Sequence, residues 1–310
     1  MSLQNSLTTP RPDLESPAAQ DCIQVSIVIP VYNEENAIVP VIHETKQAMD
    51  QTSYAYEILV VDDGSSDATP EKAKAEGVRL LQRPQRRGSG TARRNGIEAA
   101  RGEIVVMIDG DGSYQASDIP RLLSYFPQYD QVNGARQTEE GTMKWLRAPA
   151  KYFIRKLACY LSHTNIPDLN TGLKAFKRSI MLRYLWVLPD GFSCVSTMTL
   201  AFLCNGYDVT WVPAGYRKRI GQSKFHPVWD TASYMLTVIR MIIYFKPLSV
   251  LLPASFLLLC LALAKGIHSI WFSTGRLGFF ELITSMTAVL IAVLALIADL
   301  IVAQGRKPME

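Results

Sequence analysis

Short apolar runs alternate with helical patterns along the first third of the chain. The apolar runs, which are rich in β-branched residues and predict strands, lie at 25–31, 57–61, 78–81 and 103–108. The segments between them predict helices at 34–50, 67–76 and 91–101. Strands that are apolar on both faces and alternate with helices are typical of a mostly parallel sheet covered on both sides. We therefore expect an α/β domain.

Two longer apolar segments follow near the C-terminal end. Residues 248–264 and 282–298 contain no charged side chain, and each run continues for several residues past its first charge. Each reaches the ~20 residues that cross a bilayer core. A short polar turn at 273–278, flanked by aromatic residues, joins them. The pattern predicts a transmembrane hairpin, with a helical hairpin buried in a soluble core as the alternative.

The charges beside this hairpin predict its orientation. Lys246 precedes the hairpin, and Arg306 and Lys307 follow it, so the positive-inside rule places both ends in the cytoplasm. Residues 1–21 are polar and rich in proline without an apolar core, which predicts a disordered tail rather than a signal peptide. We expect an α/β domain at 22–228 in the cytoplasm, an amphipathic interface helix (or a buried core helix) at 229–247, and the hairpin with a short cytoplasmic tail at 248–310.

Composition narrows the class of protein. Of the 310 residues, 48% are hydrophobic and 19% are charged, which is too apolar for a disordered protein. The net charge of +4 is smaller than nucleic-acid binders usually carry, so we expect no nucleic-acid partner. The five cysteines are scattered without a C-x-x-C pair, which argues against a zinc ribbon or a disulfide scaffold.

Polar clusters follow three of the predicted strands, where ligands of parallel sheets bind. They are 32–34, 62–63 and the pair Asp109 and Asp111. The last pair suits a hard cation that also binds a diphosphate, although an ordinary Asp-Gly turn is the alternative. Asp62 and Asp63 fit either contacts to a ribose or base, or a turn followed by a helix capped by Asp67.

Basic residues form three further groups, each of which is either a solvated face or a contact to phosphates or lipid headgroups. The glycine-rich segment 88–96 lacks both the dinucleotide-binding and the P-loop pattern. Around it lie Arg83, Arg86, Arg87, Arg93 and Arg94. The second group is Arg136, Lys144, Arg147, Lys151, Arg155 and Lys156, and the third is Arg217, Lys218, Arg219 and Lys224. The four histidines are isolated, so none is expected to be catalytic.

Together these motifs resemble the family 2 glycosyltransferases. The matching segments are 28–35 (VIPVYNEE), 61–67 (VDDGSSD), 88–92 (GSGTA) and 109–111 (DGD). Two others, 168–176 (DLNTGLKAF) and 219–224 (RIGQSK), are similar to the polyprenyl-phosphate branch, which includes dolichyl-phosphate mannose synthases and members with a C-terminal membrane hairpin.

The resemblance implies a GT-A fold and a set of site residues. Pro30, Tyr32, Glu34, Asp62 and Asp63 would line the nucleotide-sugar pocket together with Asp109. Asp109 and Asp111, with Ser113, would hold Mg²⁺ or Mn²⁺. The acceptor phosphate would be bound by Arg136, Arg147 and Lys151, and Arg219 and Lys224 would close over the phosphates.

The sequence departs from the branch at three of these places. Ser113 stands where a glutamine commonly completes the metal shell, so the third ligand is Ser113, Gln115 or water. Lys151 replaces a usual serine. Arg219 is one residue closer to the following glycine than usual, so Lys218 is the alternative to it.

The implied activity is metal-dependent, inverting transfer of a hexose from a UDP-sugar or GDP-mannose to a polyprenyl phosphate. The D-G-D-G form favours a UDP-sugar. The alternatives are transfer to a lipid hydroxyl and a membrane-tethered nucleotide-sugar sensor. A processive polysaccharide synthase is not expected, because two helices are too few for a channel and no Q-x-x-R-W is present. The sequence is compatible with a homo-oligomer.

Overall fold

One mixed sheet organises the α/β domain. The computed structural model describes residues 22–136, 164–191, 193–220, 244–273 and 278–305, and the single residues 156, 159, 236 and 240. Within them the strand order is β3-β2-β1-β4-β6-β5-β7. The strands are β1 (Val25–Val31), β2 (Tyr56–Asp62), β3 (Arg79–Gln82), β4 (Ile104–Met107), β5 (Gln131–Arg136), β6 (Lys174–Lys177) and β7 (Val209–Ala214). Among the described strands, only β6 runs antiparallel to its neighbours, β4 and β5, which confirms a mostly parallel sheet.

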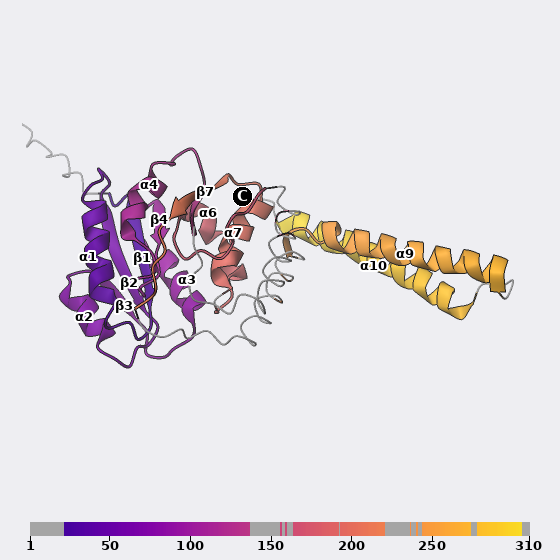
Figure 1. Cartoon of the computed structure of the whole chain (residues 1–310), viewed down its shortest axis with the longest axis horizontal. Coiled ribbons are helices and arrows are strands. Elements are labelled where there is room, and N and C mark those ends of the chain that lie inside the picture. Colours follow the sequence, from indigo (N-terminus) through magenta and orange to yellow (C-terminus); the bar gives the residue numbers. More distant parts are fainter. Residues whose placement is uncertain are drawn as a thin grey trace, which may run out of the picture.

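Helices cover both faces of this sheet (Figure 1). One face packs against α1 (Ile38–Met49), α2 (Thr69–Ala75), η1 (Ala116–Asp118) and α4 (Ile119–Leu123). The other packs against α3 (Ser89–Ala99), α6 (Arg178–Leu182), η2 (Leu185–Val187) and α7 (Cys194–Cys204). Side chains alternate along each strand, so that in β1 Ile27 and Ile29 enter one cluster and Val28 the other. This explains the apolar runs that the sequence shows.

Several element boundaries differ from the prediction. The first helix begins at Ile38 rather than residue 34, because residues 35–37 form a turn. The third begins at Ser89, two residues early. Asp67 is not the capping residue that the sequence predicts, because the capping position of α2 is Ala68, one residue later; Asp67 instead accepts a hydrogen bond from the Thr69 backbone N–H at 3.0 Å.

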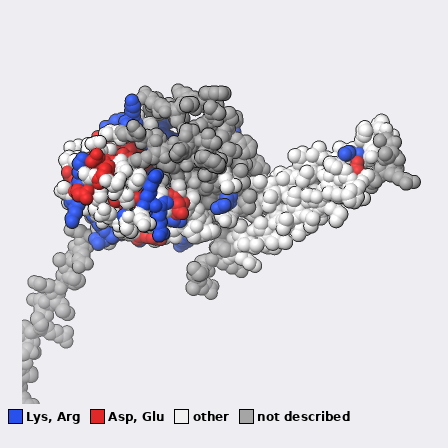
Figure 2. Space-filling model, turned by 90° about the horizontal axis from the view of Figure 1, so that it is seen from below, with Lys and Arg blue, Asp and Glu red and all other residues white. Residues whose placement is uncertain are grey.

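Two long helices project from the domain side by side (Figure 1). They are α9 (Leu248–His268), continued by the π-helical turn η3 (Ser269–Ser273), and α10 (Phe279–Gly305). Leu248–Phe272 and Phe279–Gln304 are long and apolar enough to cross a membrane, with mean hydropathies of 2.2 and 2.7. Apart from charged atoms near its far end, the hairpin surface in Figure 2 is uncharged.

Small residues let these two helices approach closely. The buried positions between them include Ala262, Ala288 and Ala295, and the Ser255 hydroxyl donates to the Ala288 carbonyl at 2.7 Å. Large apolar side chains point outward instead. Only 17% and 11% of the most apolar windows of the two helices are buried, so the structure does not show a hairpin enclosed in a soluble core.

Some predicted features lie outside the described residues. They are the tail at 1–21, most of the interface helix at 229–247, the residues after 305, and the side chains of Arg147, Lys151 and Lys224. These remain predictions.

Candidate active site

Three polar loops meet at one edge of the sheet. β1 lies between β2 and β4 and is parallel to both, so the loops that follow these strands are neighbours. They carry residues 32–34, 62–63 and 109–111. The structure therefore brings together the three clusters that the sequence predicts at strand ends.

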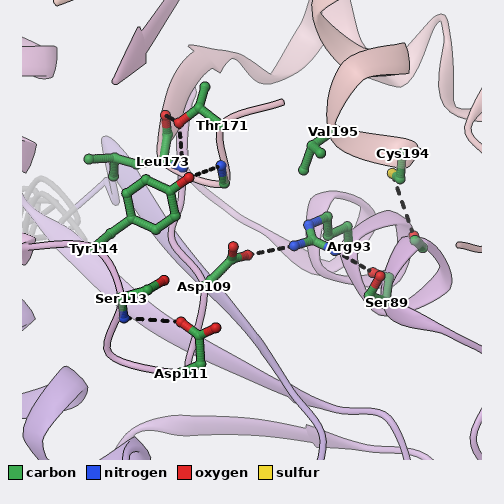
Figure 3. Close-up of polar contacts among 12 residues, drawn as sticks. Ser89, Arg93, Asp109, Asp111, Ser113, Tyr114, Thr171, Leu173, Cys194 and Val195 are labelled. Atoms are coloured by element: carbon green, nitrogen blue, oxygen red, sulfur yellow. Dashed lines mark hydrogen bonds and ion pairs between the residues drawn. The ribbon is translucent and has the colours of Figure 1, made fainter. Parts of the chain in front are cut away.

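Asp109 is held by a buried arginine (Figure 3). The Arg93 guanidinium, on α3, donates to Asp109 Oδ1 at 2.5 Å. Arg93 is only 6% exposed, and its Nε has no partner among the described residues. Gly172 lies directly against this carboxylate, because a Cβ at that position would overlap its oxygens unless the Asp109 side chain moved. The carboxylate is thus fixed in direction before any ligand binds.

The sequence did not predict this role of Arg93, which there belongs to a run of basic residues. The available signal was helical spacing: Arg93, Gly96 and Ile97 are three and four residues apart and share the buried face of α3. Arg94 is also used within the protein, because it pairs with Asp190 and donates to the Leu188 carbonyl at 2.8 Å.

Asp111 contacts a segment that comes from far along the chain. Its Oδ1 accepts the Ser113 backbone N–H at 3.0 Å, and its Oδ2 lies 3.3 Å from the Arg219 guanidinium. Burial opposes the charged form of Arg219, but the charge of Asp111, together with Tyr216 and Asp109, outweighs it and raises the pKa of the guanidinium. Backbone bonds from Arg217 to the Ser113 carbonyl and from Ile220 to the Asp111 carbonyl fasten the segment. Arg219 thus lies beside the predicted metal ligands.

Asp109 and Asp111 fit a hard cation that arrives with a substrate. Among the described residues no cluster of three or more histidine, cysteine, aspartate or glutamate side chains could hold a metal ion. Mg²⁺ is commonly bound by one or two carboxylates together with substrate phosphates, which matches this pair. Ser113 is 1% exposed and has both backbone groups engaged. Its role as a ligand stays a prediction.

Asp62 and Asp63 hold the neighbouring loops in shape. Asp62 is fully buried and accepts the Ser65 backbone N–H at 3.2 Å as well as the Ser65 hydroxyl. Asp63 accepts the backbone N–H groups of Arg87 and Gly88 at 3.0 and 2.7 Å. In this conformation both carboxylates are used within the protein, which fits the turn interpretation. Their contact with a nucleotide stays a prediction.

The loop after β1 forms the adjoining wall. Pro30 is buried in β1 itself, while Tyr32 is partly exposed and has the Arg86 guanidinium 4.4 Å from its ring centre. The backbone N–H of Glu34 donates to the Thr69 hydroxyl at 2.9 Å. Asn33 adopts a positive φ of 51° and accepts the Ser66 backbone N–H at 2.8 Å. Asn33 belongs to the predicted polar cluster 32–34, but the sequence did not predict that it joins the first two loops.

Arg136 is oriented by an unpredicted partner, Asp168. Its Nε and Nη2 donate to the two Asp168 oxygens at 2.7 and 2.9 Å. Burial opposes both charges, but this pairing outweighs it, lowering the pKa of Asp168 and raising that of Arg136. The guanidinium also lies 5.4 Å from the Tyr216 ring centre. Asp168 therefore fixes the orientation of the Arg136 guanidinium.

Two tyrosines connect Arg136 with the aspartate loop. Tyr114 and Tyr216 form an isolated antiparallel bridge, and their rings meet edge to face at 5.2 Å. The Tyr114 hydroxyl accepts the Gly172 backbone N–H at 2.8 Å (Figure 3). Burial raises the pKa of Tyr114, so it remains neutral. The arrangement gathers three ion pairs around one edge of the sheet: Arg93 with Asp109, Arg136 with Asp168, and Arg219 with Asp111.

Comparison with known proteins identifies the family. Residues 26–185 match glycosyl transferase family 2. A dolichyl-phosphate hexose transferase of Haloferax volcanii is 31% identical over 219 residues, covering 70% of this chain and 92% of that protein. An undecaprenyl-phosphate 4-deoxy-4-formamido-L-arabinose transferase of Sodalis glossinidius is 29% identical over 278 residues, covering 84% and 82%. The chain belongs to glycosyl transferase family 2, which confirms the predicted resemblance.

A solved structure supports the fold. Glucosyl-3-phosphoglycerate synthase from Mycobacterium tuberculosis, crystallised with Mn²⁺, UDP and phosphoglyceric acid, matches with a TM-score of 0.54 and 23% identity. The match covers 71% of this chain and 77% of that chain. The fold is therefore GT-A-like, followed here by two long apolar helices.

Proposed function

We propose that this protein transfers a hexose from a nucleotide-diphosphate sugar to the phosphate of a polyprenyl phosphate at a membrane surface. The observation that carries the proposal is the gathering of Asp109, Asp111, Arg136 and Arg219 at one sheet edge of a domain that bears an apolar hairpin. The similarity to transferases named for dolichyl and undecaprenyl phosphate supports the acceptor class.

The donor side of the reaction belongs to the aspartate loop. Asp109 and Asp111 would hold Mg²⁺ or Mn²⁺, which supplies positive charge to the departing nucleoside diphosphate when bound. Arg219 lies beside Asp111 and carries a guanidinium that can bind two phosphate oxygens at once. Lys224 follows on the same segment. The D-G-D-G sequence and the UDP bound by the structural relative favour a UDP-sugar.

The acceptor side requires positive charge rather than a base. A lipid phosphate is already anionic near neutral pH, so its oxygen can attack C1 of the sugar without losing a proton. The bond from C1 to the donor phosphate breaks, its electron pair leaves with the nucleoside diphosphate, and in-line attack inverts C1. Arg136, with Arg147 and Lys151, would hold the attacking phosphate, so catalysis is orientation and electrostatic stabilisation.

The hairpin would place this chemistry at the lipid. We infer that α9 and α10 span the bilayer and that the basic residues at 246, 306 and 307 keep the catalytic domain on the cytoplasmic side. A polyprenyl phosphate then presents its phosphate at the surface from which the hairpin enters.

A transfer assay with matched acceptors tests the proposal. The detergent-purified full chain is mixed with Mg²⁺ or Mn²⁺, labelled UDP- and GDP-sugars, and either undecaprenyl phosphate, undecaprenol or diacylglycerol. We expect label in the lipid phase with the phosphate acceptor and one productive donor. Label on diacylglycerol or the alcohol alone would mean transfer to a hydroxyl. Nucleotide-sugar binding without any lipid product would mean a sensor.

A further inference from the structure

Two exposed aromatic side chains meet where the domain joins the hairpin. Trp186, on η2, is 70% exposed, which is unusual for so large an apolar group. Its ring centre lies 6.1 Å from that of Tyr244, which is 45% exposed. Tyr244 precedes Leu248, the first residue of α9, by four positions. Residues from the domain and from the entry to the hairpin thus form one aromatic patch.

The joint between domain and hairpin is packed. Phe245, next to Tyr244, is 5% exposed and belongs to the domain core. The Tyr184 ring stands edge to face against both Phe245, at 6.1 Å, and Tyr207, at 6.2 Å. Val250, in the first turn of α9, also packs against this core. The entry to α9 is therefore fastened to the domain, and the hairpin direction fixes which face of the domain lies toward a membrane.

That face carries the aromatic patch. In Figure 1, α6 and α7, which flank η2 in the sequence, lie on the side of the domain from which the hairpin leaves. A bilayer spanned by α9 has its surface near Leu248, and therefore at the level of Tyr244. Tryptophan and tyrosine are enriched in this zone because their rings are apolar and their N–H and O–H groups remain hydrated.

We propose that Trp186 and Tyr244 insert into the headgroup zone of the bilayer that the hairpin spans, and form a membrane-docking patch of the catalytic domain. The proposal rests on the membrane-spanning hairpin of the proposed function. It assigns a lipid contact to η2, a part of the domain that is remote in sequence from the hairpin.

The patch connects directly to the donor side of the active site. The residues after η2 bind the start of α3: the Gly90 N–H donates to the Asp190 carbonyl at 2.7 Å, and the Thr91 hydroxyl to its carboxylate at 2.7 Å. A Cβ at Gly90 would overlap the Pro189 carbonyl, so this contact is close. The same helix carries Arg93, which holds Asp109. Docking of Trp186 would thus set the height of the aspartate loop above the lipid phosphates.

Tryptophan quenching by brominated lipids tests the docking patch. The sequence holds five tryptophans, so single-tryptophan proteins are made by changing the others to phenylalanine. They are reconstituted in phosphatidylcholine vesicles brominated either near the headgroup or deep in the acyl chain. Trp271, 79% exposed at the far end of the hairpin, is the membrane control. Trp211, whose Nε1 donates to the Asp168 carbonyl, is the control inside the domain.

We expect the protein that keeps Trp186 to be quenched as strongly as the one that keeps Trp271, and more by shallow than by deep bromines. The one that keeps Trp211 should remain unquenched. Quenching in the protein that keeps Trp271 but not in the one that keeps Trp186 would overturn the docking patch. The membrane-spanning hairpin would still be supported. Absence of quenching at both positions would overturn the membrane span itself. None of these quenching measurements depends on sugar transfer. A failure of the docking patch can therefore be distinguished from a failure of the catalytic proposal.

A kinetic variant adds a second measurement. Trp186→Ala should raise the KM for a long-chain polyprenyl phosphate in vesicles several-fold, with the KM for the nucleotide sugar unchanged. Trp186→Phe should restore part of the loss, because phenylalanine retains the apolar ring. Equal changes in both KM values would contradict a role in membrane docking.

Discussion

The guanidinium of Arg219 lies 3.3 Å from Oδ2 of Asp111, so a basic residue neutralises one of the two carboxylates predicted to hold a metal. Arg93 does the same for Asp109 at 2.5 Å. A divalent cation that binds Asp111 must compete with Arg219, whereas Arg93 engages only Oδ1 of Asp109 and leaves Oδ2 for a ligand. A nucleoside diphosphate would relieve that competition, because its negative charges give Arg219 an alternative partner. The charge arrangement therefore favours binding of metal and nucleotide together.

Removal of Arg219 should tighten metal binding in the absence of nucleotide. An ion pair at a partly exposed site contributes up to ~1 kcal/mol, which corresponds to about fivefold in affinity. We expect Arg219→Ala to bind free Mn²⁺ about fivefold more tightly, measured by electron paramagnetic resonance, and to transfer sugar poorly. Arg217→Ala is the matched control, because Arg217 is on the same segment and pairs with Glu44 at 2.6 Å. Weaker Mn²⁺ binding by Arg219→Ala would contradict the competition.

The carboxylate of Asp111 should be indispensable for transfer. Asp111→Asn retains the shape of the side chain and can still accept the Ser113 N–H, so the fold should persist. It loses the charge that a hard cation requires. We expect transfer to vanish while the thermal unfolding midpoint stays near that of the unmodified protein. Asp208→Asn, at an exposed carboxylate, should retain full activity. Near-normal turnover of Asp111→Asn would contradict a metal ion bound by Asp111 in the reaction.

Arg93 should act as a positioning residue for Asp109. Loss of a group that orients a metal ligand commonly lowers metal affinity or activity by 10–100-fold. We expect Arg93→Met to lower kcat/KM within about that range and to weaken Mn²⁺ binding in the presence of UDP. The control is Arg101→Met, at an exposed position just beyond α3. A variant with unchanged metal affinity and lower activity would assign Arg93 a role other than holding Asp109.

Much of this site was predictable from the sequence. The parts that were not predictable depend on long-range contacts. The strand ends that carry Asp62, Asp109 and Asp111 follow from apolar runs, which mark buried strands without knowledge of their partners. Helical spacing could mark Arg93 as buried, but neither the pairing of Arg93 with Asp109 nor that of Asp168 with Arg136 was predictable. Their contacts join segments 16 and 32 residues apart, and a single sequence does not show which distant charges pair. The antiparallel position of β6 in the sheet was likewise not predicted, because strand order depends on such long-range contacts.

A buried lysine behind the site predicts a pH dependence of stability. Lys174 is fully buried and donates to the Val195 carbonyl at 2.6 Å and the Thr199 hydroxyl at 3.0 Å. Burial lowers its pKa from 10.5 to about 7. Between these values the unfolded chain binds more protons than the folded one, so stability increases as pH rises from about 7 toward 10.5.

Substitution of this lysine isolates the effect. Lys174→Met cannot titrate, so the unfolding midpoint of the lysine protein should rise relative to that of the variant between pH 7 and 10. The measurement is thermal unfolding of both full chains in the same detergent across this range. Other groups contribute equally to both proteins, so they cancel in the difference. A difference that does not change with pH would show that Lys174 keeps its ordinary pKa.

The acceptor arginine of the sequence prediction also has a kinetic signature. Arg147→Ala should raise the KM for the lipid phosphate far more than the KM for the nucleotide sugar, because the lost charge would bind only the acceptor. Initial rates with each substrate varied in turn measure both values. Equal effects on the two substrates would argue against an acceptor role.

The most direct test of the central claim is the position of the new bond. The lipid product is made from undecaprenyl phosphate and the productive donor labelled with ¹³C at C1 of the sugar, and is examined by nuclear magnetic resonance. Attack by the lipid phosphate predicts that C1 couples to a single ³¹P nucleus and that its anomeric configuration is opposite to that of the donor. A labelled lipid whose C1 shows no phosphorus coupling would contradict the account.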